Sequence, residues 1–468
     1  MVFSSLNFLF QFLPAVLVAY YLSPKKLRNA MLFAASLVFY AWGEPLYIFL
    51  MIFSTLFNYV NGLLIDRFRD RRMAARAVFI LSITGNLAIL GFYKYAGFVV
   101  DNLNGLLNLQ LTAADLPLPI GLSFYTFQTM SYVADVYLRK TEAQRNIIHL
   151  GTYVTMFPQL VAGPIVKYGD IAKQLTERQV TLEGFGKGAE LFIRGLAKKV
   201  LLANNIGLLW SSVKTTPADE LTVLAAWLGI LAFTLQIYFD FSGYSDMARG
   251  LARMFGFEFQ LNFNYPYISR SVTEFWRRWH ISLGSWFREY VYIPLGGNRA
   301  GLSKQLRNLL IVWLLTGLWH GASWNFVIWG LYFGLLVTME KLFLLQWLQR
   351  WGRPAGHLYT MLAVIIGWVW FEFVHLGSAW TFIGTLFGAS SAGWADTQAL
   401  YDLSTNALLL LAAVLCATPL PRRLALRVKD QWPLAGAIAV PAGYLAALVL
   451  STAYLVDETY NPFLYFRF

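Results

Sequence analysis

The densest group of charged and aromatic side chains in this sequence lies between residues 274 and 290. It reads Glu274–Phe275–Trp276–Arg277–Arg278–Trp279–His280, and Arg288, Glu289 and Tyr290 follow. On a helix, Glu274, Arg277 and Arg278 would lie three or four positions apart, which allows ion pairs within the segment. The same composition suits an interfacial helix that tryptophan and long arginine side chains anchor at a membrane surface. Composition alone leaves both interpretations open.

A second histidine, His320, stands in a different setting. It follows the apolar run 309–319, and no other Asp, Glu, Lys, Arg or His occurs between Arg307 and Glu340. An ionisable side chain at membrane depth is a candidate functional residue by default, and histidine can carry a proton near neutral pH. The alternative is a structural histidine that donates to a backbone carbonyl across a helix contact. Both interpretations stand at this point.

Two further polar clusters interrupt apolar runs of the sequence. One contains Gln236, Asp240, Ser242, Tyr244, Ser245 and Asp246, and the other contains Gln159 with Gly163–Pro164. The two aspartates have no His or Cys at ligand spacing, so the sequence predicts no metal site. Acidic residues in a membrane segment also suit a proton or sodium pathway. A transporter therefore stays in consideration.

The elements that must position these residues are membrane helices. Hydrophobic residues make up 57% of the 468 residues and charged residues 13%, against about a quarter charged in an average soluble domain. Apolar stretches such as 6–22, 45–65 and 221–239 approach the roughly 20 residues that a spanning helix needs. They do not alternate in polarity, as barrel strands would. The sequence predicts an all-α polytopic membrane protein of one domain, residues 1–468, with about ten to twelve spans or half-spans.

Three segments mix apolar residues with Pro, Gly, Arg and His, and these are 116–135, 146–166 and 271–298. Irregular backbone and charge survive at membrane depth only where protein covers them or where they line a water-filled cavity. We therefore expect re-entrant or interfacial pieces there, and we expect the chemistry there as well.

The distribution of basic residues predicts the orientation of the chain. Lys25, Lys26 and Arg28 precede the second span, and the arginines of 67–76 follow the third, so both groups should lie on the cytoplasmic side. Near the other end, Arg422, Arg423, Arg427 and Lys429 mark another cytoplasmic loop. Both termini are then expected outside a bacterial inner membrane. The net charge of +12 is explained by such loops and by anionic lipid, and nucleic acid is not an expected partner.

Seven motifs in a fixed order carry a resemblance to a known family. They are MVFSS at 1–5, FYAWGEP at 39–45, FPQLVAGPI at 157–165, FDFSGYSD at 239–246, FWRRWHISL at 275–283, YIPLGGNR at 292–299 and GLWHGASW at 317–324. With these motifs the chain resembles the membrane-bound O-acyltransferase (MBOAT) superfamily, in the branch of the alginate O-acetyltransferase membrane subunit. The resemblance runs nearly from end to end.

The resemblance implies an MBOAT-type helical fold around a central transmembrane passage, with a catalytic core at about residues 117–340. His320 matches the near-universal catalytic histidine of the superfamily, and His280 matches the second histidine of this branch. A neutral His320 would take the proton of the attacking hydroxyl, and His280 would orient it or stabilise negative charge, with the reverse assignment open. Further candidates for lining or supporting the passage are Trp276, Arg277, Arg278, Trp279, Asp240, Gln159, Asn298 and Trp319.

Two other features bear on the acyl acceptor. Relatives often carry a further histidine shortly after 329–332, where this chain has Phe333. The tail 463–468 resembles a terminal aromatic motif whose tyrosine is proposed to carry the acyl group, which makes Tyr465 an acyl-relay candidate in the extracytoplasmic tail 457–468. An aryl ester is a suitable covalent carrier. An aromatic belt that anchors the tail at the interface is the alternative.

The expected function is that of a transmembrane O-acyltransferase. It would take acetyl from a cytoplasmic thioester, acetyl-CoA, without a bound cofactor. It would pass the acetyl group to an extracytoplasmic acetyltransferase partner that modifies a polysaccharide. D-alanyl transfer to teichoic acid is the alternative within the superfamily. A transporter or flippase for the polysaccharide precursor is the alternative outside it, although the sequence shows no internal repeat of the kind that many transporters have.

Overall fold

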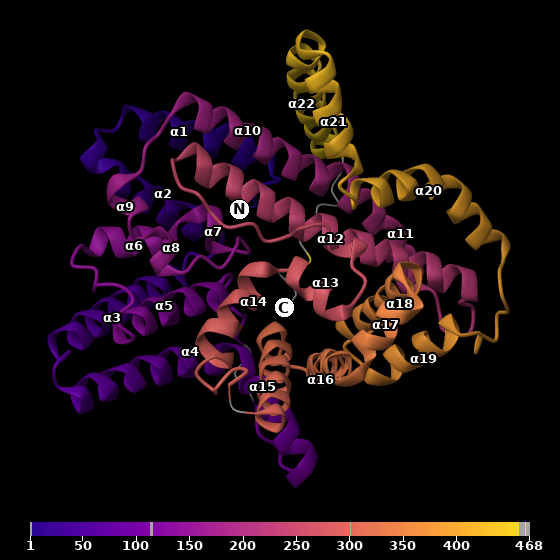
Figure 1. Cartoon of the computed structure of the whole chain (residues 1–468), viewed down its shortest axis with the longest axis horizontal. Helices are drawn as coiled ribbons and strands as arrows, with labels where there is room; N and C mark the ends of the chain where they lie inside the picture. Colours follow the sequence, from indigo (N-terminus) through magenta and orange to yellow (C-terminus); the bar gives the residue numbers. More distant parts are fainter. Residues whose placement is uncertain (1, 113–115, 300, 458–463, 465–468) are drawn as a thin grey trace. The chain divides into compact units, whose positions relative to one another are not determined.

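The computed structural model describes residues 2–112, 116–299, 301–457 and 464. Every regular element within these residues is a helix (Figure 1), as the apolar composition predicts. Seven helices in this part of the chain are long and apolar enough to cross a membrane. They are α3 (Ile48–Arg67), α4 (Arg72–Leu107), α12 (Val223–Met254), α16 with its continuation (Trp324–Trp351), α18 (Arg353–Glu372), α20 (Thr397–Cys416) and α22 (Pro433–Asp457). The multi-pass helical architecture is confirmed.

The remaining apolar stretches form shorter helices. The first apolar segment, Phe8–Leu22, is a helix too short for the length that defines the seven spanning helices. Helix α15 (Leu302–His320), which carries His320, has several polar residues in its first two turns and is not among the seven spanning helices. The ten to twelve spans and half-spans counted from the sequence therefore comprise seven long helices and several shorter pieces.

The chain divides into two compact units, and each is built from segments distant in sequence. The first unit comprises Met1–Phe192 and Ser245–Gln260, and the second comprises Ile193–Tyr244 and Leu261–Phe468. The first contains α3, α4, the end of α12, most of α10 (Leu182–Ala197) and these elements: η1 (Phe8–Phe12), α1 (Leu13–Leu22), η2 (Lys25–Leu27), α2 (Arg28–Gly43), α5 (Leu122–Tyr137), α6 (Ile147–Thr155), α7 (Phe157–Leu160), α8 (Tyr168–Ile171) and α9 (Gln174–Glu177).

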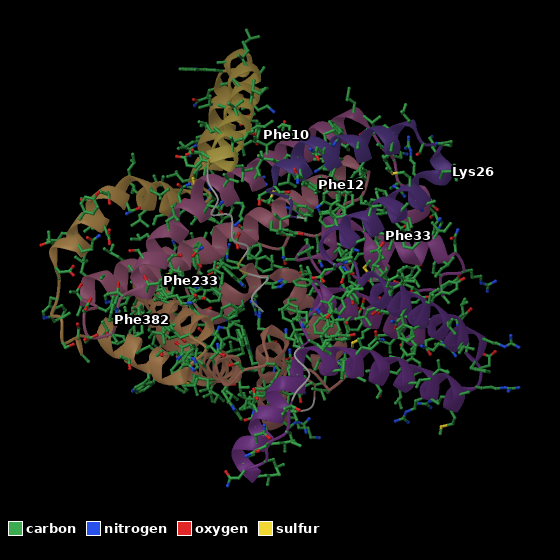
Figure 2. All side chains as sticks on the ribbon, turned by 180° about the vertical axis from the view of Figure 1, so that it is seen from behind. Phe10, Phe12, Lys26, Phe33, Phe233 and Phe382 are labelled. Carbon is green, nitrogen blue, oxygen red and sulfur yellow. The ribbon has the colours of Figure 1, made fainter. Side chains whose placement is uncertain are left out.

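Buried amides and aromatic rings hold the first unit together. Asn58 on α3 and Asn86 on α4 exchange side-chain hydrogen bonds of 3.0 and 2.8 Å, and both side chains are buried. Phe12, labelled in Figure 2, packs against Phe39 and Phe157 at ring-centroid distances of 5.5 and 5.4 Å. A buried amide pair fixes the register of two apolar helices, because a slip would leave the amides unsatisfied.

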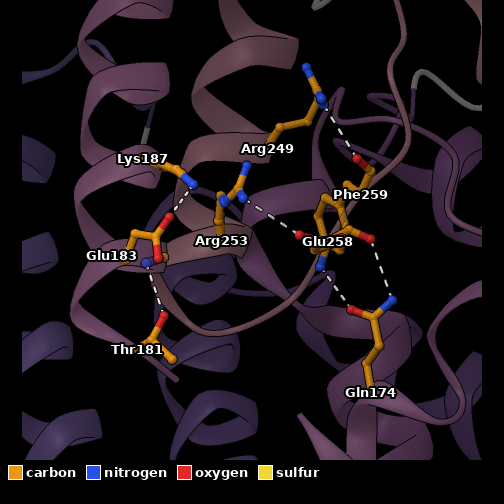
Figure 3. Close-up of polar contacts among 9 residues, drawn as sticks. Gln174, Thr181, Glu183, Lys187, Arg249, Arg253, Glu258 and Phe259 are labelled. Carbon is orange, nitrogen blue, oxygen red and sulfur yellow. Dashed lines mark hydrogen bonds and ion pairs between the residues drawn. The ribbon is translucent and has the colours of Figure 1, made fainter. Parts of the chain in front are cut away.

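Polar contacts fix the loop that follows α12 within the first unit (Figure 3). Gln174 accepts from the Glu258 backbone N–H at 2.7 Å and donates to the Glu258 carbonyl at 3.4 Å. Arg253 pairs with Glu258 at 3.7 Å, and Arg249 donates to the Phe259 carbonyl at 3.4 Å. The backbone is therefore fixed just before it continues into residues 261–264.

The second unit contains the remaining elements. Besides the larger part of α12 and α15, α16, α18, α20 and α22, these are η3 (Lys198–Asn204), α11 (Asn205–Thr215), η4 (Pro266–Ile268), α13 (Val272–Arg278), α14 (Ile281–Phe287), η5 (Arg288–Tyr292), η6 (Glu340–Leu344), α17 (Leu345–Trp351), α19 (Leu376–Leu386) and α21 (Leu420–Gln431). Helices α21 and α22 lie side by side as a hairpin (Figure 1). Phe233 and Phe382, labelled in Figure 2, both pack on Trp210, at 5.3 and 6.0 Å.

Glycines allow α15 and α16 to cross closely. A Cβ on Gly317 would lie 2.2 Å from the Phe326 carbonyl oxygen, and a Cβ on Gly330 would lie 2.5 Å from the Trp313 carbonyl oxygen. Small residues at such a crossing let helix backbones approach where lipid supplies no hydrophobic force between them. The crossing lies one turn before His320 and fixes the end of α15.

Candidate active site

His280 occupies the junction between two short helices of the second unit. It follows α13 and precedes α14, and its backbone is left-handed, with φ 46° and ψ 52°. Only 2% of the residue is exposed. A left-handed conformation is uncommon for residues other than glycine, and such strain persists where the surrounding structure enforces it, often at functional sites.

Helix α13 is held at its start by two side chains. The Ser271 hydroxyl accepts from the Glu274 backbone N–H at 3.0 Å. The buried Glu340 carboxylate accepts from the backbone N–H groups of Val272 and Thr273, at 2.5 and 2.8 Å. A carboxylate at a helix start accepts hydrogen bonds from amides that lack intrahelical partners, and its negative charge interacts favourably with the positive end of the helix dipole. The helix that leads to His280 is thereby fixed.

Asn262 positions the His280 ring. Its Oδ1 lies 3.2 Å from His280 Nδ1 and accepts from the Ser282 backbone N–H at 3.1 Å and the Ser282 hydroxyl at 2.9 Å. Asn262 itself is fully buried. The backbone supports this contact, because Ile281 N–H donates to the Asn262 carbonyl at 3.0 Å. The strand-like pairing of residues 262–264 with 278–282 thus holds the ring in place.

These contacts also define where the His280 proton resides. A backbone N–H only donates, so the Asn262 atom that faces Ser282 must be the amide oxygen. That oxygen can only accept, so His280 Nδ1 carries the proton in this contact, and Nε2 is the acceptor of the neutral ring. His280 lies outside the seven long apolar helices, and burial lowers its pKa to about 3. The ring is therefore neutral at physiological pH.

His320 is the last residue of α15 and is enclosed by aromatic rings. Only 4% of it is exposed. Its ring centroid lies 4.9 Å from Trp319, 5.0 Å from Trp329 and 5.2 Å from Phe371. These rings exclude water and limit the rotation of the imidazole. An aromatic enclosure also provides a low-dielectric surrounding, in which a preorganised polar group acts more strongly than in water.

Trp319 contacts the rings of both histidines. Its ring lies 6.0 Å from the His280 ring and 4.9 Å from the His320 ring, centroid to centroid. The sequence places these residues about forty positions apart, on α15 and on the turn before α14. Two imidazoles that contact one tryptophan are candidates for proton transfer in one reaction.

A larger aromatic cluster continues from this site. Trp276 lies 5.4 Å from Trp329 and 4.8 Å from Phe333, and Trp279 lies 4.9 Å from Trp368. Phe333, which stands where a further histidine is expected from the resemblance, is fully buried within this cluster. An apolar ring at position 333 supplies packing and no third imidazole.

The charged residues of the same segment lie at its edge. Arg278 pairs with Glu274 at 2.9 Å, as the helical spacing in the sequence predicts, and it also donates to the Asn264 carbonyl at 3.1 Å. Arg277 is exposed. Helix α13 ends at Arg278, and only Trp279 lies between Arg278 and His280 in the sequence. The charged and catalytic candidates therefore share one turn of the chain.

Asp240 forms a buried ion pair in the same unit. Its Oδ1 lies 2.8 Å from Lys199 Nζ, and the two side chains are 2% and 3% exposed. Its Oδ2 accepts from the Leu464 backbone N–H at 2.8 Å. The neighbouring Phe241 ring lies 4.7 Å from the His280 ring, so α12 links this pair to the histidine site. Buried charges persist when partners and hydrogen bonds compensate their desolvation.

The other predicted candidates have different surroundings. Gln159 belongs to the first unit, where its side chain is buried and donates to the Tyr153 carbonyl. Asn298 is exposed on the turn before α15, and it accepts from the Tyr292 hydroxyl at 2.6 Å. Tyr465 lies outside the described residues. No group of three or more potential metal ligands occurs in the described part of the chain.

Sequence reasoning missed Asn262 and Lys199. Asn262 lies in a segment where polar Gln260, Asn262 and Asn264 alternate with apolar residues, and this alternation is the signal that one face is buried. Lys199 lies in the run 198–204, and an adjacent Asp240 could not be inferred from spacing. Both residues act through partners that are distant in sequence.

Comparison with known proteins identifies the family. Residues 144–375 match the model of the MBOAT, membrane-bound O-acyltransferase family. The chain is 39% identical over 501 residues to the probable alginate O-acetylase AlgI of Azotobacter vinelandii, with all of both chains covered. It is 44% identical over 395 residues to the protein of that name from Pseudomonas aeruginosa, covering 83% of this chain and 75% of the relative. The peptidoglycan O-acetyltransferase of Helicobacter pylori is 32% identical over 415 residues, covering 82% of this chain and 76% of the relative. The chain belongs to the membrane-bound O-acyltransferase family and is a membrane O-acyltransferase.

Proposed function

We propose that this protein transfers an acetyl group from a cytoplasmic thioester, acetyl-CoA, across the membrane for O-acetylation of a polysaccharide. The observation that carries the proposal is the pair of buried histidines around Trp319, one of them held by Asn262 with Nε2 as its acceptor. The relatives named as an alginate O-acetylase and a peptidoglycan O-acetyltransferase support acetyl as the group and a polysaccharide as the final acceptor.

The proposed reaction is an acyl transfer with His320 as general base. A hydroxyl oxygen attacks the thioester carbonyl carbon while His320 accepts the hydroxyl proton. The C–S bond then breaks, the new ester keeps the acetyl group, and the proton passes from the imidazole to the leaving thiolate. His280 offers Nε2 as a second acceptor that orients the hydroxyl. General-base catalysis of this kind contributes about 10²–10⁴-fold.

Trp329 supports the step as a hydrogen-bond donor. Its ring contacts His320, the residue is fully buried, and its Nε1 has no acceptor among the described residues. A buried indole N–H usually finds a partner. In the proposed complex that partner is the carbonyl oxygen of the thioester, on which negative charge develops during attack.

The proposal includes Tyr465 as an acyl relay between the donor and an extracytoplasmic partner. Its immediate neighbour in the sequence, Leu464, is 2% exposed and donates its backbone N–H to Asp240. The residue after Asp240 is Phe241, whose ring contacts His280. The Tyr465 hydroxyl would accept acetyl from the thioester, and a second enzyme would pass it on to the polysaccharide. A phenolate is a better leaving group than an alkoxide, so the aryl ester retains its reactivity as a donor.

Orientation follows from the basic loops. In the first unit, the Tyr20 and Tyr21 hydroxyls donate to the carbonyls of Phe255 and Met254, both at 2.7 Å. These bonds place the end of α12 on the same side as Lys25, Lys26 and Arg28, the side that the positive-inside rule assigns to the cytoplasm. We accordingly propose an inner-membrane protein with donor entry on this side and both termini outside.

The test is turnover of radiolabelled acetyl-CoA by the purified full-length protein in nanodiscs. Wild type is compared with His320→Ala and Tyr465→Phe, and mass spectrometry follows the C-terminal peptide. His375→Ala and Tyr401→Phe are matched controls of the same residue types, because both residues are exposed whereas His320 is buried. Label on Tyr465 in wild type and in both controls, and its loss in both test variants, supports the relay. A wild type that neither hydrolyses nor accepts acetyl contradicts the donor assignment.

A further inference from the structure

A basic pocket of the second unit lies next to the turn that carries His280. Its volume is about 360 Å³, and Asn264, Tyr265, Arg278, Arg422, Arg423 and Leu426 are among the residues that line it. The pocket combines the end of α13 with the start of α21, segments more than 140 positions apart in the chain. Its volume falls within the roughly 300–1,000 Å³ that is typical of small-molecule sites.

The pocket carries an excess of positive charge. Arg278 is compensated by Glu274 at 2.9 Å. Arg422 and Arg423 have no carboxylate within ion-pair distance among the described residues, and both are exposed. The pocket also includes Pro419, the residue directly before α21, so the positive end of the helix dipole adds to the same field. Guanidinium groups match phosphate oxygens in bidentate geometry.

The backbone of the pocket shows a second unusual feature. Tyr265 adopts a left-handed conformation, with φ 48° and ψ 62°. The Asn264 backbone N–H donates to the Arg278 carbonyl at 2.9 Å, and Arg278 donates to the Asn264 carbonyl at 3.1 Å. These bonds join two walls of the pocket, and one of them continues into the segment that holds Asn262 against His280.

We infer that Arg422 and Arg423, together with Arg278, form a binding site for phosphate groups. This inference rests on the proposed function in one respect, the identification of the ligand as the phosphorylated end of the thioester donor. A coenzyme thioester carries its phosphates on a nucleotide that a flexible arm separates from the reacting carbonyl. When the phosphates bind beside Arg278, the arm can extend toward His280, which is two residues further along the chain. A phospholipid headgroup presents the same chemistry and is the second source.

The test measures binding and turnover separately, with full-length protein in neutral phosphatidylcholine nanodiscs. The double variant R422Q/R423Q is compared with R427Q/K429Q, which removes equal charge from the same exposed helix at positions that do not line the pocket. Acetyl-CoA is titrated to obtain KM and kcat. Binding of radiolabelled adenosine 3′,5′-bisphosphate, which lacks the thioester arm, is measured by equilibrium dialysis. A second set of nanodiscs contains added phosphatidylglycerol.

We expect R422Q/R423Q to raise the acetyl-CoA KM and to weaken bisphosphate binding by about tenfold or more, with a smaller change in kcat, because two charge-assisted contacts are lost. R427Q/K429Q should match wild type. If only the response to phosphatidylglycerol is lost in R422Q/R423Q, the phosphate belongs to a lipid headgroup. Equal behaviour of the two double variants in all three measurements overturns the site. Charge-dependent bisphosphate binding without turnover in wild type would retain the site and refute the proposed function.

Discussion

Replacement of Asn262 by leucine should slow acyl transfer by misplacing His280. The change preserves side-chain volume but removes the oxygen that accepts from His280 Nδ1, the Ser282 N–H and the Ser282 hydroxyl, at 3.2, 3.1 and 2.9 Å. Without this acceptor the imidazole can rotate or change tautomer. Since general-base catalysis contributes about 10²–10⁴-fold in total, we expect a loss of about 10–100-fold in kcat for a displaced second histidine.

The same substitution has a cost in stability. The Ser282 N–H would lose its Asn262 acceptor, whereas His280 Nδ1 would keep the Ser282 hydroxyl oxygen at 3.4 Å. A buried donor that loses its acceptor costs about 1–3 kcal/mol. We expect the free energy of unfolding to fall by about 1–3 kcal/mol. The control is Asn58→Leu, which removes a fully buried amide that bonds Asn86 and Ser82 in the first unit. Asn58→Leu should lose similar stability, while its kcat per folded molecule stays near that of wild type.

Asn262→Asp changes the charge next to the His280 ring while it keeps the shape of the side chain. A carboxylate of the same shape accepts the same three hydrogen bonds, and the Asn262 Nδ2 that it replaces has no acceptor among the described residues. Negative charge beside the ring favours the imidazolium and raises the pKa of His280. The pH–rate profile should therefore gain a break at higher pH than in wild type. An Asn262→Leu protein that folds and keeps wild-type kcat, or an Asp variant with an unchanged pH profile, would refute the positioning role.

Two further predictions concern the crossing of α15 with α16 and the protonation of His280. Gly317→Ala should lower the unfolding free energy by about 1–3 kcal/mol and reduce kcat, because its Cβ would lie 2.2 Å from the Phe326 carbonyl oxygen. Thermal melting and turnover assays measure the two effects. The control Gly91→Ala should be neutral, because its Cβ would meet no atom within 4 Å. The folded-state pKa of His280 is lowered from 6.5 to about 3. Between these two pH values the unfolded chain binds more protons than the folded chain. The unfolding free energy therefore falls as the pH drops below 6.5, by about 1.4 kcal/mol per pH unit. His280→Gln should show a shallower decline from pH 7 to pH 5 in melting experiments, and equal slopes would contradict burial of the neutral ring.

The helical architecture could be predicted because its cause is local. Long apolar runs must be helices in lipid, and the positions of α3, α12 and α18 follow from composition. The two histidines could be proposed from their settings, His320 at the end of an apolar run and His280 within a dense polar motif. Their placement around Trp319 is tertiary, and no periodicity predicts it.

The partners that fix the site were harder to predict. Asn262 and His280 are 18 positions apart and meet through a pairing of irregular segments. Lys199 would ordinarily indicate a cytoplasmic loop, yet it is buried because Asp240 compensates its charge. Asn298 belongs to a long motif, but the structure places it on an exposed turn, where it bonds Tyr292. A motif gives the position of a residue in sequence, and packing decides whether the residue reaches the site.

The hydrogen bond between Asp240 and Leu464 has a consequence for the order in which the protein matures. Asp240 and Leu464 are 224 positions apart. A ribosome that adds about 5–20 residues per second therefore needs roughly 10–45 s to reach Leu464 after it has added Asp240. During this interval Lys199, which precedes Asp240 in the sequence, has already been synthesised and can pair with it. The carboxylate acquires its backbone donor only when residue 464 has been made. Completion of this buried cluster is therefore a late event in synthesis. A chain that stops short of residue 464 would retain the ion pair but would lack this donor to one carboxylate oxygen.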